Sequence, residues 1–263
     1  MKLSIITTTY NSAATIAESV ISVNNQTYQN IEHIIIDGAS TDDTIKIIKS
    51  TPNRVAKIVS ESDLGIYDAL NKGIHLANGE IIGLLHSDDS FASTQTIRNI
   101  VDIFNDKGYD QKPVDIVYGD LVFVDKQNIN KVVRYWKSKQ FNPGMLKRGW
   151  MPPHPTIFMR REVYEKKGLF NISLKCAADY DFILRVFNNR SYKISYLPEV
   201  ITKMRVGGIS TGGIKNLINK KKEDYWVLKN NKIPSPLWVL FLKNISKIKQ
   251  LIFRRSKIYN NKL

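Results

Sequence analysis

Short apolar runs alternate with amphipathic segments along the first hundred residues of the chain. Ile81, Ile82, Leu84 and Leu85 form one such run beside glycines, a pattern typical of a strand buried on both faces. The predicted strands of this part are 2–9, 31–36, 55–59 and 81–85, and the predicted helices are 16–23, 66–77 and 94–105. This alternation with short connections predicts an α/β fold with a mostly parallel, doubly wound sheet.

The pattern changes in the second half of the chain. Residues 115–124 and 131–136 are separated by a polar turn, which predicts two antiparallel strands. Short strands are expected at 156–159 and 200–206, and a helix begins near Cys176. The glycine-rich segment 207–213 is a candidate lid.

Acidic side chains follow two of the predicted parallel strands. Asp37 ends the second strand, and Asp88 and Asp89 follow the strand at 81–85. The carboxyl ends of strands are the ligand-binding edge of an open α/β sheet. Two adjacent acids repel each other unless a cation lies beside them, and a hard divalent cation that carries phosphates is a natural occupant. The alternative is that Asp89 or Ser90 caps the following helix, which begins near Ser93.

The charge of the chain is concentrated near its end. The formal net charge is +15, and residues 215–263 hold 13 Lys or Arg against two acids, a net +11, which leaves +4 for the first 214 residues. We therefore divide the chain into a domain at 1–213 and a basic helical appendage at 214–263. In the appendage, one face is predicted to hold Trp238, Phe241, Ile245, Ile248 and Ile252, and the opposite face Lys243, Lys247 and Arg254.

The basic appendage has three interpretations. It is a solvated tail, a nucleic-acid-binding segment, or a helix that docks on an anionic membrane surface, where each Lys or Arg contributes about 1 kcal/mol. The alternation of basic and aromatic residues favours the membrane. The single cysteine excludes an intrachain disulfide and fits a reducing compartment. No signal-peptide pattern and no apolar stretch of about 20 residues is found, so we expect a cytoplasmic protein on the inner face of the cell membrane.

Five short motifs occur in a fixed order along the chain. They are Thr8-Thr9-Tyr10-Asn11, Asp37-Gly38-Ala39-Ser40-Thr41-Asp42, Gly65-Ile66-Tyr67-Asp68-Ala69-Leu70-Asn71-Lys72-Gly73, Ser87-Asp88-Asp89 and Ala178-Asp179-Tyr180-Asp181. This set resembles the inverting glycosyltransferases of family 2, in particular those of the colanic-acid type that build bacterial surface polysaccharides. The resemblance covers roughly residues 1–213 and implies the GT-A fold, with a small antiparallel part on the acceptor side.

The resemblance implies a nucleotide-sugar site at the sheet edge. The positions that it places around the nucleotide and its sugar are Thr8, Tyr10, Asn11, Asp37, Asp63, Gly65 and Asp88. Asp88 and Asp89 match the D-x-D region, where Asp89 and also Asp88 would hold a Mn²⁺ or Mg²⁺ ion. Many relatives have an acid or Asn where this chain has His86, so the dependence on metal is open at this point.

Asp179 matches the acid that accepts the proton of the acceptor hydroxyl. A carboxylate within hydrogen-bond reach can do this as the hydroxyl attacks, and a single base implies one displacement with inversion. The alternative is that Asp179 only complements a helix dipole, with Asp181 solvated. His154, between prolines, is either structural or part of the acceptor wall.

We therefore expect an enzyme that moves a sugar from a nucleotide-diphosphate sugar, a UDP-sugar, to a hydroxyl of a growing lipid-linked glycan. Two other classes stay open. A nucleotidyltransferase that makes nucleotide sugars would usually have a glycine-rich phosphate loop after its first strand, which is missing here. A non-catalytic module that binds membranes or nucleic acids is the other.

Overall fold

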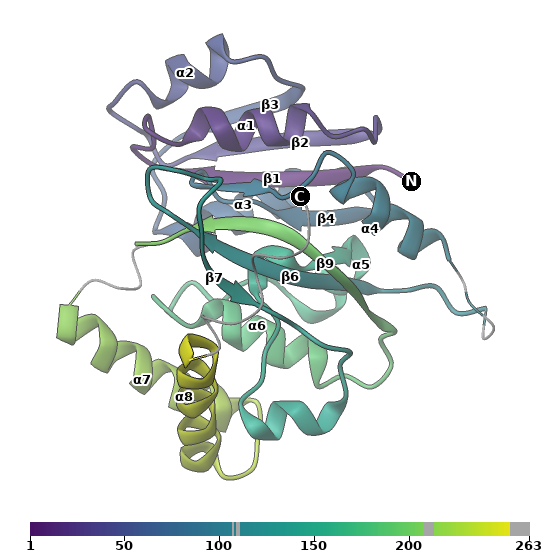
Figure 1. The fold of residues 1–263 in the computed structure, drawn as a ribbon, viewed down its shortest axis with the longest axis vertical. Helices are drawn as coiled ribbons and strands as arrows, with labels where there is room; N and C mark the ends of the chain where they lie inside the picture. Colours follow the sequence, from purple (N-terminus) through teal and green to yellow (C-terminus); the bar gives the residue numbers. More distant parts are fainter. Residues whose placement is uncertain (107, 109–110, 208–212, 253–263) are drawn as a thin grey trace.

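The structure is a computed structural model that describes residues 1–106, 108, 111–207 and 213–252. Four parallel strands form one half of its sheet, in the order β3–β2–β1–β4 (Figure 1). They are β1 (Leu3–Thr9), β2 (Ile31–Asp37), β3 (Val55–Ser60) and β4 (Ile81–Leu84), connected by α1 (Ile16–Asn24), α2 (Thr44–Ser50) and α3 (Ile66–Leu76). This arrangement confirms the predicted α/β fold.

Helices cover both faces of this parallel half, because successive side chains of a strand point to opposite faces. On β2, Ile34 and Ile36 pack in the same cluster as Ala69 and Leu70 of α3. Their neighbour Ile35 belongs to another cluster, with residues of α1 and α2. The continuous apolar run of β2 is therefore explained by burial on two sides.

The other half of the sheet is mostly antiparallel. β8 pairs antiparallel with both β4 and β6, β9 runs parallel to β6, and β5 and β7 pair antiparallel with β9 and β6. The bounds are β5 (Asp89–Phe91), β6 (Ile116–Val124), β7 (Val132–Trp136), β8 (Phe158–Arg160) and β9 (Ile194–Arg205). Between them lie α4 (Thr96–Asn105), the 3-10 turns η1 (Pro143–Arg148) and η2 (His154–Thr156), and α5 (Arg161–Lys167).

Asp89 does not cap a helix. It is the first residue of β5, where it pairs with Met204 of β9, and α4 begins only at Thr96. The capping alternative for Asp89 is therefore wrong. The segment proposed as a lid includes residues 208–212, which lie outside the described residues.

The described part of the chain also contains the helices α6 (Ala178–Phe187), α7 (Gly213–Asn230) and α8 (Pro236–Ile252). Figure 1 shows α7 and α8 beside α6, below the sheet in that view. Val227, Leu228 and Val239 are fully buried and belong to the cluster that also contains α6 and α3 residues. These residues of α7 and α8 thus contribute to a core that they share with the sheet domain, and the interpretation as a solvated tail does not hold for them.

The described part of α8 keeps the two predicted faces, but its basic face packs against the protein at Lys243 and its aromatic face is exposed. Lys243 is buried, with its Nζ 3.0 Å from Asp224 Oδ2 and 3.5 Å from the centre of the Tyr180 ring. Trp238 and Phe241, which were predicted to form the apolar face, are exposed and stack on each other. Lys243 can face inward because a carboxylate and an aromatic ring replace its hydration. The side chains of residues 246–263 lie outside the described part of the chain.

No helix of the described residues is long and apolar enough to cross a membrane.

Candidate functional site

The carboxylate of Asp89 is buried without a protein partner. The residue is 1% exposed, and within the described residues neither carboxylate oxygen has a hydrogen-bond partner. Burial, and then the neighbouring charge of Asp88, raise the pKa of Asp89 well above its ordinary value, although Arg205 acts in the opposite direction. Burial also raises the pKa of Asp88. An unpaired buried carboxylate is costly, so such a group calls for a ligand.

A chain of polar contacts runs from the end of β1 to Asp179. Thr8 Oγ1 lies 3.3 Å from His86 Nδ1, and His86 Nε2 lies 3.2 Å from His154 Nε2. His154 Nδ1 is 3.4 Å from Asp179 Oδ2. Asp179, in the first turn of α6, is thereby brought to the edge where β1 and β4 end, although 90 residues of sequence separate it from Asp89.

The two histidines in this series of contacts, His86 and His154, are neutral at neutral pH. Burial lowers the pKa of His86 to about 3, and burial also lowers the pKa of His154, with the charge of Asp179 acting against it. A neutral imidazole has one donor nitrogen and one acceptor nitrogen. Because a carboxylate only accepts, the His154 Nδ1 that faces Asp179 carries the proton, and its Nε2 accepts from His86 Nε2. His86 Nδ1 then accepts from the Thr8 hydroxyl, so one set of tautomers satisfies every contact.

Asp179 has a second donor that the sequence did not indicate. The hydroxyl of Tyr67, in the first turn of α3, donates to Asp179 Oδ1 over 3.3 Å. Burial, and then the charge of Asp179, raise the pKa of Tyr67, so this hydroxyl keeps its proton and acts as a donor. Tyr67 and His154 thus contact the two different oxygens of the Asp179 carboxylate and hold its orientation.

The residues proposed for nucleotide binding gather at the ends of β1, β2 and β3. Tyr10 is 63% exposed. Gly38 lies close to two of them, since a Cβ on it would be 2.6 Å from Asp63 Oδ2 and 3.4 Å from the Tyr10 ring. Gly65 has φ +117°, a conformation that favours glycine, and its N–H donates to Asp63 Oδ1. Asp63 is therefore in contact with both glycine-containing turns.

Asp37 is fully buried and is already engaged. Its oxygens accept from the Ser40 N–H and hydroxyl and from the Ser60 hydroxyl. Ser40 is used in this way and does not cap α2, because Asp43 is the residue that precedes that helix. Asn11, with φ 46°, accepts from the Thr41 N–H and so ties the first motif to the second. Any role of Asp37 in base binding has to use its remaining acceptor capacity.

Asp88 and Asp89 fit a divalent cation whose other ligands come from a bound substrate. Carboxylate oxygens are the donors that Mg²⁺ and Mn²⁺ prefer, and both oxygens of Asp89 lack partners within the described chain. No group of three or more His, Cys, Asp or Glu residues that could hold a metal ion occurs among those residues. The remaining ligands would therefore come from substrate phosphates and water, as is usual for Mg²⁺.

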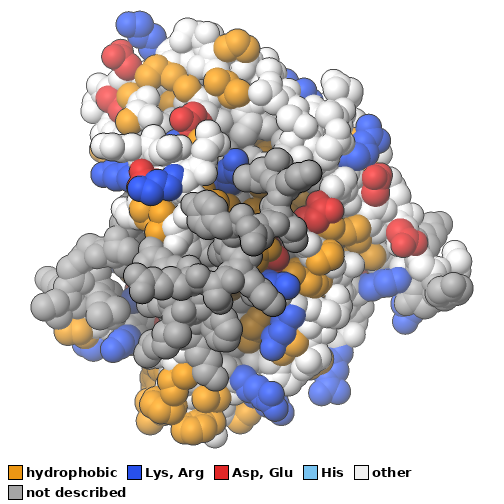
Figure 2. Space-filling model, in the orientation of Figure 1, with side chains coloured by type: hydrophobic (Ala, Val, Ile, Leu, Met, Phe, Trp, Pro, Cys, Tyr) orange, Lys and Arg blue, Asp and Glu red, His pale blue; other side chains and the backbone are white. Residues whose placement is uncertain are grey.

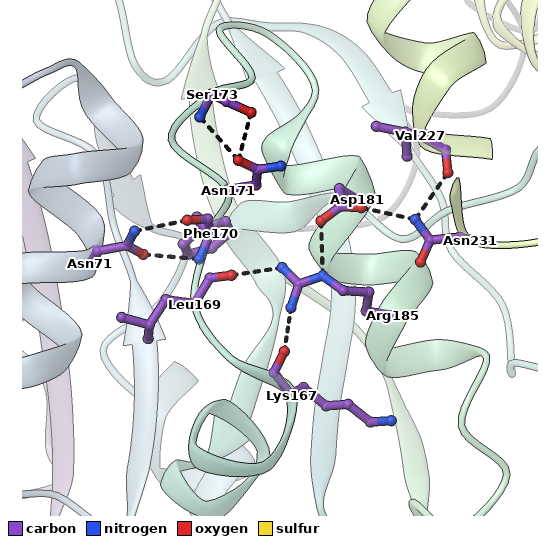
Figure 3. A network of polar contacts seen from close by, with 10 residues as sticks. All are labelled: Asn71, Lys167, Leu169, Phe170, Asn171, Ser173, Asp181, Arg185, Val227 and Asn231. Atoms are coloured by element: carbon purple, nitrogen blue, oxygen red, sulfur yellow. Dashed lines mark hydrogen bonds and ion pairs between the residues drawn. The ribbon is translucent and has the colours of Figure 1, made fainter. Parts of the chain in front are cut away.

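Asp181 is held by other protein groups, so the alternative in which it is solvated does not describe it. The residue is buried, and its carboxylate accepts from Arg185 Nε over 2.8 Å and from Asn231 Nδ2 over 2.9 Å (Figure 3). In the same view, Arg185 also donates to the Lys167 and Leu169 carbonyls. The two acids of α6 thus have different surroundings: Asp181 is bound on all sides within the protein, whereas Asp179 faces the polar chain of the sheet edge.

A mixed sheet of this strand order, with acids after its parallel strands, is the GT-A fold, and solved structures share it. Staphylococcus aureus TarS 1–349 in complex with UDP-GlcNAc superposes with a TM-score of 0.68 at 17% identity, over 98% of this chain and 74% of that one. The mannosyltransferase PcManGT of Pyrobaculum calidifontis, solved with GDP-Man and Mn²⁺, gives a TM-score of 0.64 at 20% identity, over 92% and 68%.

Sequence comparison assigns the chain to a family. The model of Glycosyl transferase family 2 matches residues 4–168. A PGL/p-HBAD biosynthesis glycosyltransferase of Mycobacterium bovis is 30% identical over 222 residues, which is 83% of this chain and 81% of the relative. An uncharacterized glycosyltransferase of Haemophilus influenzae is 28% identical over 85% of each chain. The chain therefore belongs to glycosyltransferase family 2, as the five motifs indicated.

Proposed function

We propose that this glycosyltransferase moves a sugar from a nucleotide-diphosphate sugar to a hydroxyl of a growing, lipid-linked surface glycan, with inversion at the anomeric carbon. The observation that carries the proposal is the placement of Asp179. Its carboxylate accepts from Tyr67 and contacts His154, which in turn contacts His86 at the end of the strand that leads to Asp88 and Asp89.

In this proposal Asp179 is the general base. The acceptor oxygen attacks the anomeric carbon while its proton moves to Asp179, and the bond from that carbon to the diphosphate oxygen breaks on the opposite face. A Mg²⁺ or Mn²⁺ ion held by Asp89 and Asp88 would neutralise the negative charge that grows on the leaving diphosphate. Tyr67 and His154 orient the Asp179 carboxylate. One base and one displacement require no covalent glycosyl-enzyme intermediate.

The donor is proposed to be a UDP-sugar. Thr8, Tyr10, Asn11, Asp37, Asp63 and Gly65 are proposed to line the nucleotide and sugar. The support is the fold shared with TarS, whose structure holds UDP-GlcNAc, whereas PcManGT, which has the same fold, was solved with GDP-Man and Mn²⁺. Uridine and guanosine donors are therefore the first two to compare, and Mn²⁺ the first ion.

Two linked measurements test this function. A thermal-shift panel with UDP, GDP and their sugars, each with and without Mn²⁺, should single out one nucleotide whose stabilisation depends on the ion. Incubation of that nucleotide sugar with glycan acceptors should release the nucleoside diphosphate and form a product of inverted configuration. Release of pyrophosphate from a nucleoside triphosphate would instead favour the nucleotidyltransferase alternative. Absence of turnover with every donor would favour the non-catalytic binding module.

We also propose that the α7–α8 region docks on an anionic membrane face. Figure 2 shows hydrophobic side chains gathered at the lower end of that view, over this region. Leu237, Trp238 and Phe241 are 72%, 57% and 53% exposed, and the segment 215–263 carries a net charge of +11. Aromatic and aliphatic side chains enter the interface of a bilayer, while lysines attract its anionic lipids.

Point substitutions test this docking better than deletion, because α7 and α8 contribute to the core. The double variant Trp238→Ser and Phe241→Ser should lose binding to vesicles of phosphatidylglycerol and phosphatidylcholine. The matched control is Ile172→Ser, which removes a 48% exposed side chain elsewhere on the chain and should leave vesicle binding unchanged. Equal vesicle binding by wild type and the double variant would refute the membrane role.

A further inference from the structure

The backbone just before the Asp179 helix is held by one carboxylate from α7. Glu223 Oε1 accepts from the Lys175 N–H over 3.0 Å, and Glu223 Oε2 accepts from the Cys176 and Ala177 N–H groups over 2.8 and 3.0 Å. Three successive backbone donors therefore point at a single side chain. Glu223 is 46 residues away from Ala177 in the sequence, so this is a tertiary contact and not a local turn.

The start of α6 has no cap of its own. The residue at its N-cap position is Ala177, whose side chain cannot accept a hydrogen bond. The N–H groups at a helix start need acceptors, and negative charge is favoured there by the helix dipole. Glu223 supplies an acceptor and a charge to the N–H groups of the residues that lead into this helix. Asp179 is the second residue of α6, two positions after Ala177, so fixing this backbone fixes where its carboxylate points.

Glu223 is itself held in a rigid part of the molecule. The next residue, Asp224, is buried and forms the ion pair with Lys243 of α8, over the ring of Tyr180. Val227, one turn further along α7, is fully buried. Because the helix backbone that carries Glu223 is packed in this way, only the Glu223 side chain has to be ordered when it accepts the three hydrogen bonds.

The other end of the same loop is anchored by the helix that carries Tyr67. Asn71 of α3 exchanges two hydrogen bonds with the backbone of Phe170, its Nδ2 donating over 2.9 Å and its Oδ1 accepting over 3.0 Å (Figure 3). The Phe170 ring stacks on Tyr67 at 5.9 Å. The loop that precedes Asp179 is thus fixed at one end to α3, which carries Tyr67, and at the other end to α7.

We propose that Glu223 is a positioning residue for Asp179, and that α7 is therefore part of the catalytic apparatus. The inference rests on the proposed function, in which Asp179 is the base. The three hydrogen bonds of Glu223 all go to the backbone before Asp179, so we expect its effect in the step in which the acceptor hydroxyl loses its proton. A small displacement of a catalytic group lowers the rate of the chemical step more than it lowers binding.

The test is steady-state kinetics of Glu223→Ala and Glu223→Gln in the full chain. Glu223→Ala should lower kcat about tenfold, with an unchanged donor KM and an unchanged thermal shift by the nucleoside diphosphate. Glu223→Gln keeps one acceptor oxygen and should recover part of the loss, about threefold below wild type. The matched control is Asn231→Ala, which removes a hydrogen bond between the end of α7 and Asp181; it should lower the melting temperature and leave kcat unchanged.

Three results would overturn the inference. The first is wild-type kcat in both Glu223 variants, and the second is a fall in kcat that is accompanied by a changed donor KM. The third is unfolding of both variants, which would make Glu223 a residue of stability alone. Asp179→Asn measured in parallel separates this from the proposed function. If Asp179→Asn is inactive while both Glu223 variants keep wild-type kcat, only the positioning role fails. If Asp179→Asn keeps wild-type turnover, the assignment of the base fails.

Discussion

Glu32 and Asp89 are two buried acids at opposite ends of the parallel strands, and their surroundings differ in kind. Glu32, near the start of β2, accepts from Lys2 Nζ over 2.7 Å, from the Ser4 hydroxyl over 2.5 Å, and from the backbone and side-chain amides of Asn78 over 2.8 and 3.0 Å. Burial alone would raise its pKa, but these donors outweigh burial and lower the pKa to about 2. Asp89 has no such donors among the described residues, and its pKa is raised.

This contrast separates an acid that stabilises the fold from one that the fold tolerates. A buried carboxylate with four donors contributes to stability, whereas a buried carboxylate without partners destabilises the chain unless a ligand binds it. Proteins keep such costly groups at functional sites. The substitutions below should therefore have opposite effects at the two ends of the strands: loss of activity at one and loss of stability at the other.

The largest loss of activity is expected for a substitution of Asp89, the buried acid without hydrogen-bond partners among the described residues. Asp89→Asn should lower kcat/KM at least 100-fold, because it removes a charged ligand of the proposed metal site. The melting temperature without ligand should stay the same or rise, since a buried unpaired charge is gone. The readouts are nucleoside diphosphate release and the Mn²⁺-dependent thermal shift, which should disappear. A variant that keeps both would place the metal elsewhere.

Glu32→Gln should lower the stability of the fold and leave turnover unchanged. Lowering the Glu32 pKa from 4.5 to about 2 corresponds to about 3 kcal/mol, and the free energy of unfolding near pH 7 should fall by about that amount. Because the folded pKa lies below the unfolded one, the stabilisation is present above about pH 4.5 and is lost as the pH falls towards 2. Urea unfolding of both proteins from pH 3 to 7 measures it. Turnover per folded molecule should match wild type. A loss of turnover would contradict the claim that Glu32 serves the stability of the fold alone.

Tyr67→Phe should have the smallest effect of these three. It removes one hydrogen bond to the Asp179 carboxylate and keeps the ring that stacks on Phe170. At 3.3 Å this hydrogen bond is long, so the lower limit for a bond to a charged group, about 1.5 kcal/mol, applies, and kcat should fall about tenfold with an unchanged donor KM. The control is Tyr192→Phe, whose hydroxyl has no part in the site. Wild-type kcat in Tyr67→Phe would remove Tyr67 from the proposed mechanism.

The parallel half of the fold was predictable because its signals are local. Each strand from β1 to β4 is a short apolar run, and Gly38 and the acids at the strand ends lie within a few residues of it. The antiparallel half depends on pairings between distant segments, such as Asp89 with Met204, which no local pattern encodes. The sequence placed Asp89 either in a helix cap or at a ligand edge, and only the pairing with β9 decided against the cap.

The same reason explains which site residues were missed. Tyr67 meets Asp179 across 112 residues of sequence, and Glu223 reaches the start of α6 from a separate helix. Lys243 was assigned to a basic face, and its burial was not predicted, because its partners, Asp224 and Tyr180, become neighbours only when α8 packs on α6 and α7. Residue type and periodicity showed that helices form here, but not which charges the packing would neutralise.

The most direct test of the central claim compares the two acids of α6, measured as turnover per folded molecule together with the melting temperature. Asp179→Asn should lower turnover by about 100-fold or more with an unchanged melting temperature and unchanged binding of the nucleoside diphosphate. Asp181→Asn, at a carboxylate bound by Arg185 and Asn231, should lower the melting temperature and keep turnover within about twofold of wild type. Wild-type turnover in Asp179→Asn, or a loss of turnover confined to Asp181→Asn, would contradict the assignment of Asp179 as the base.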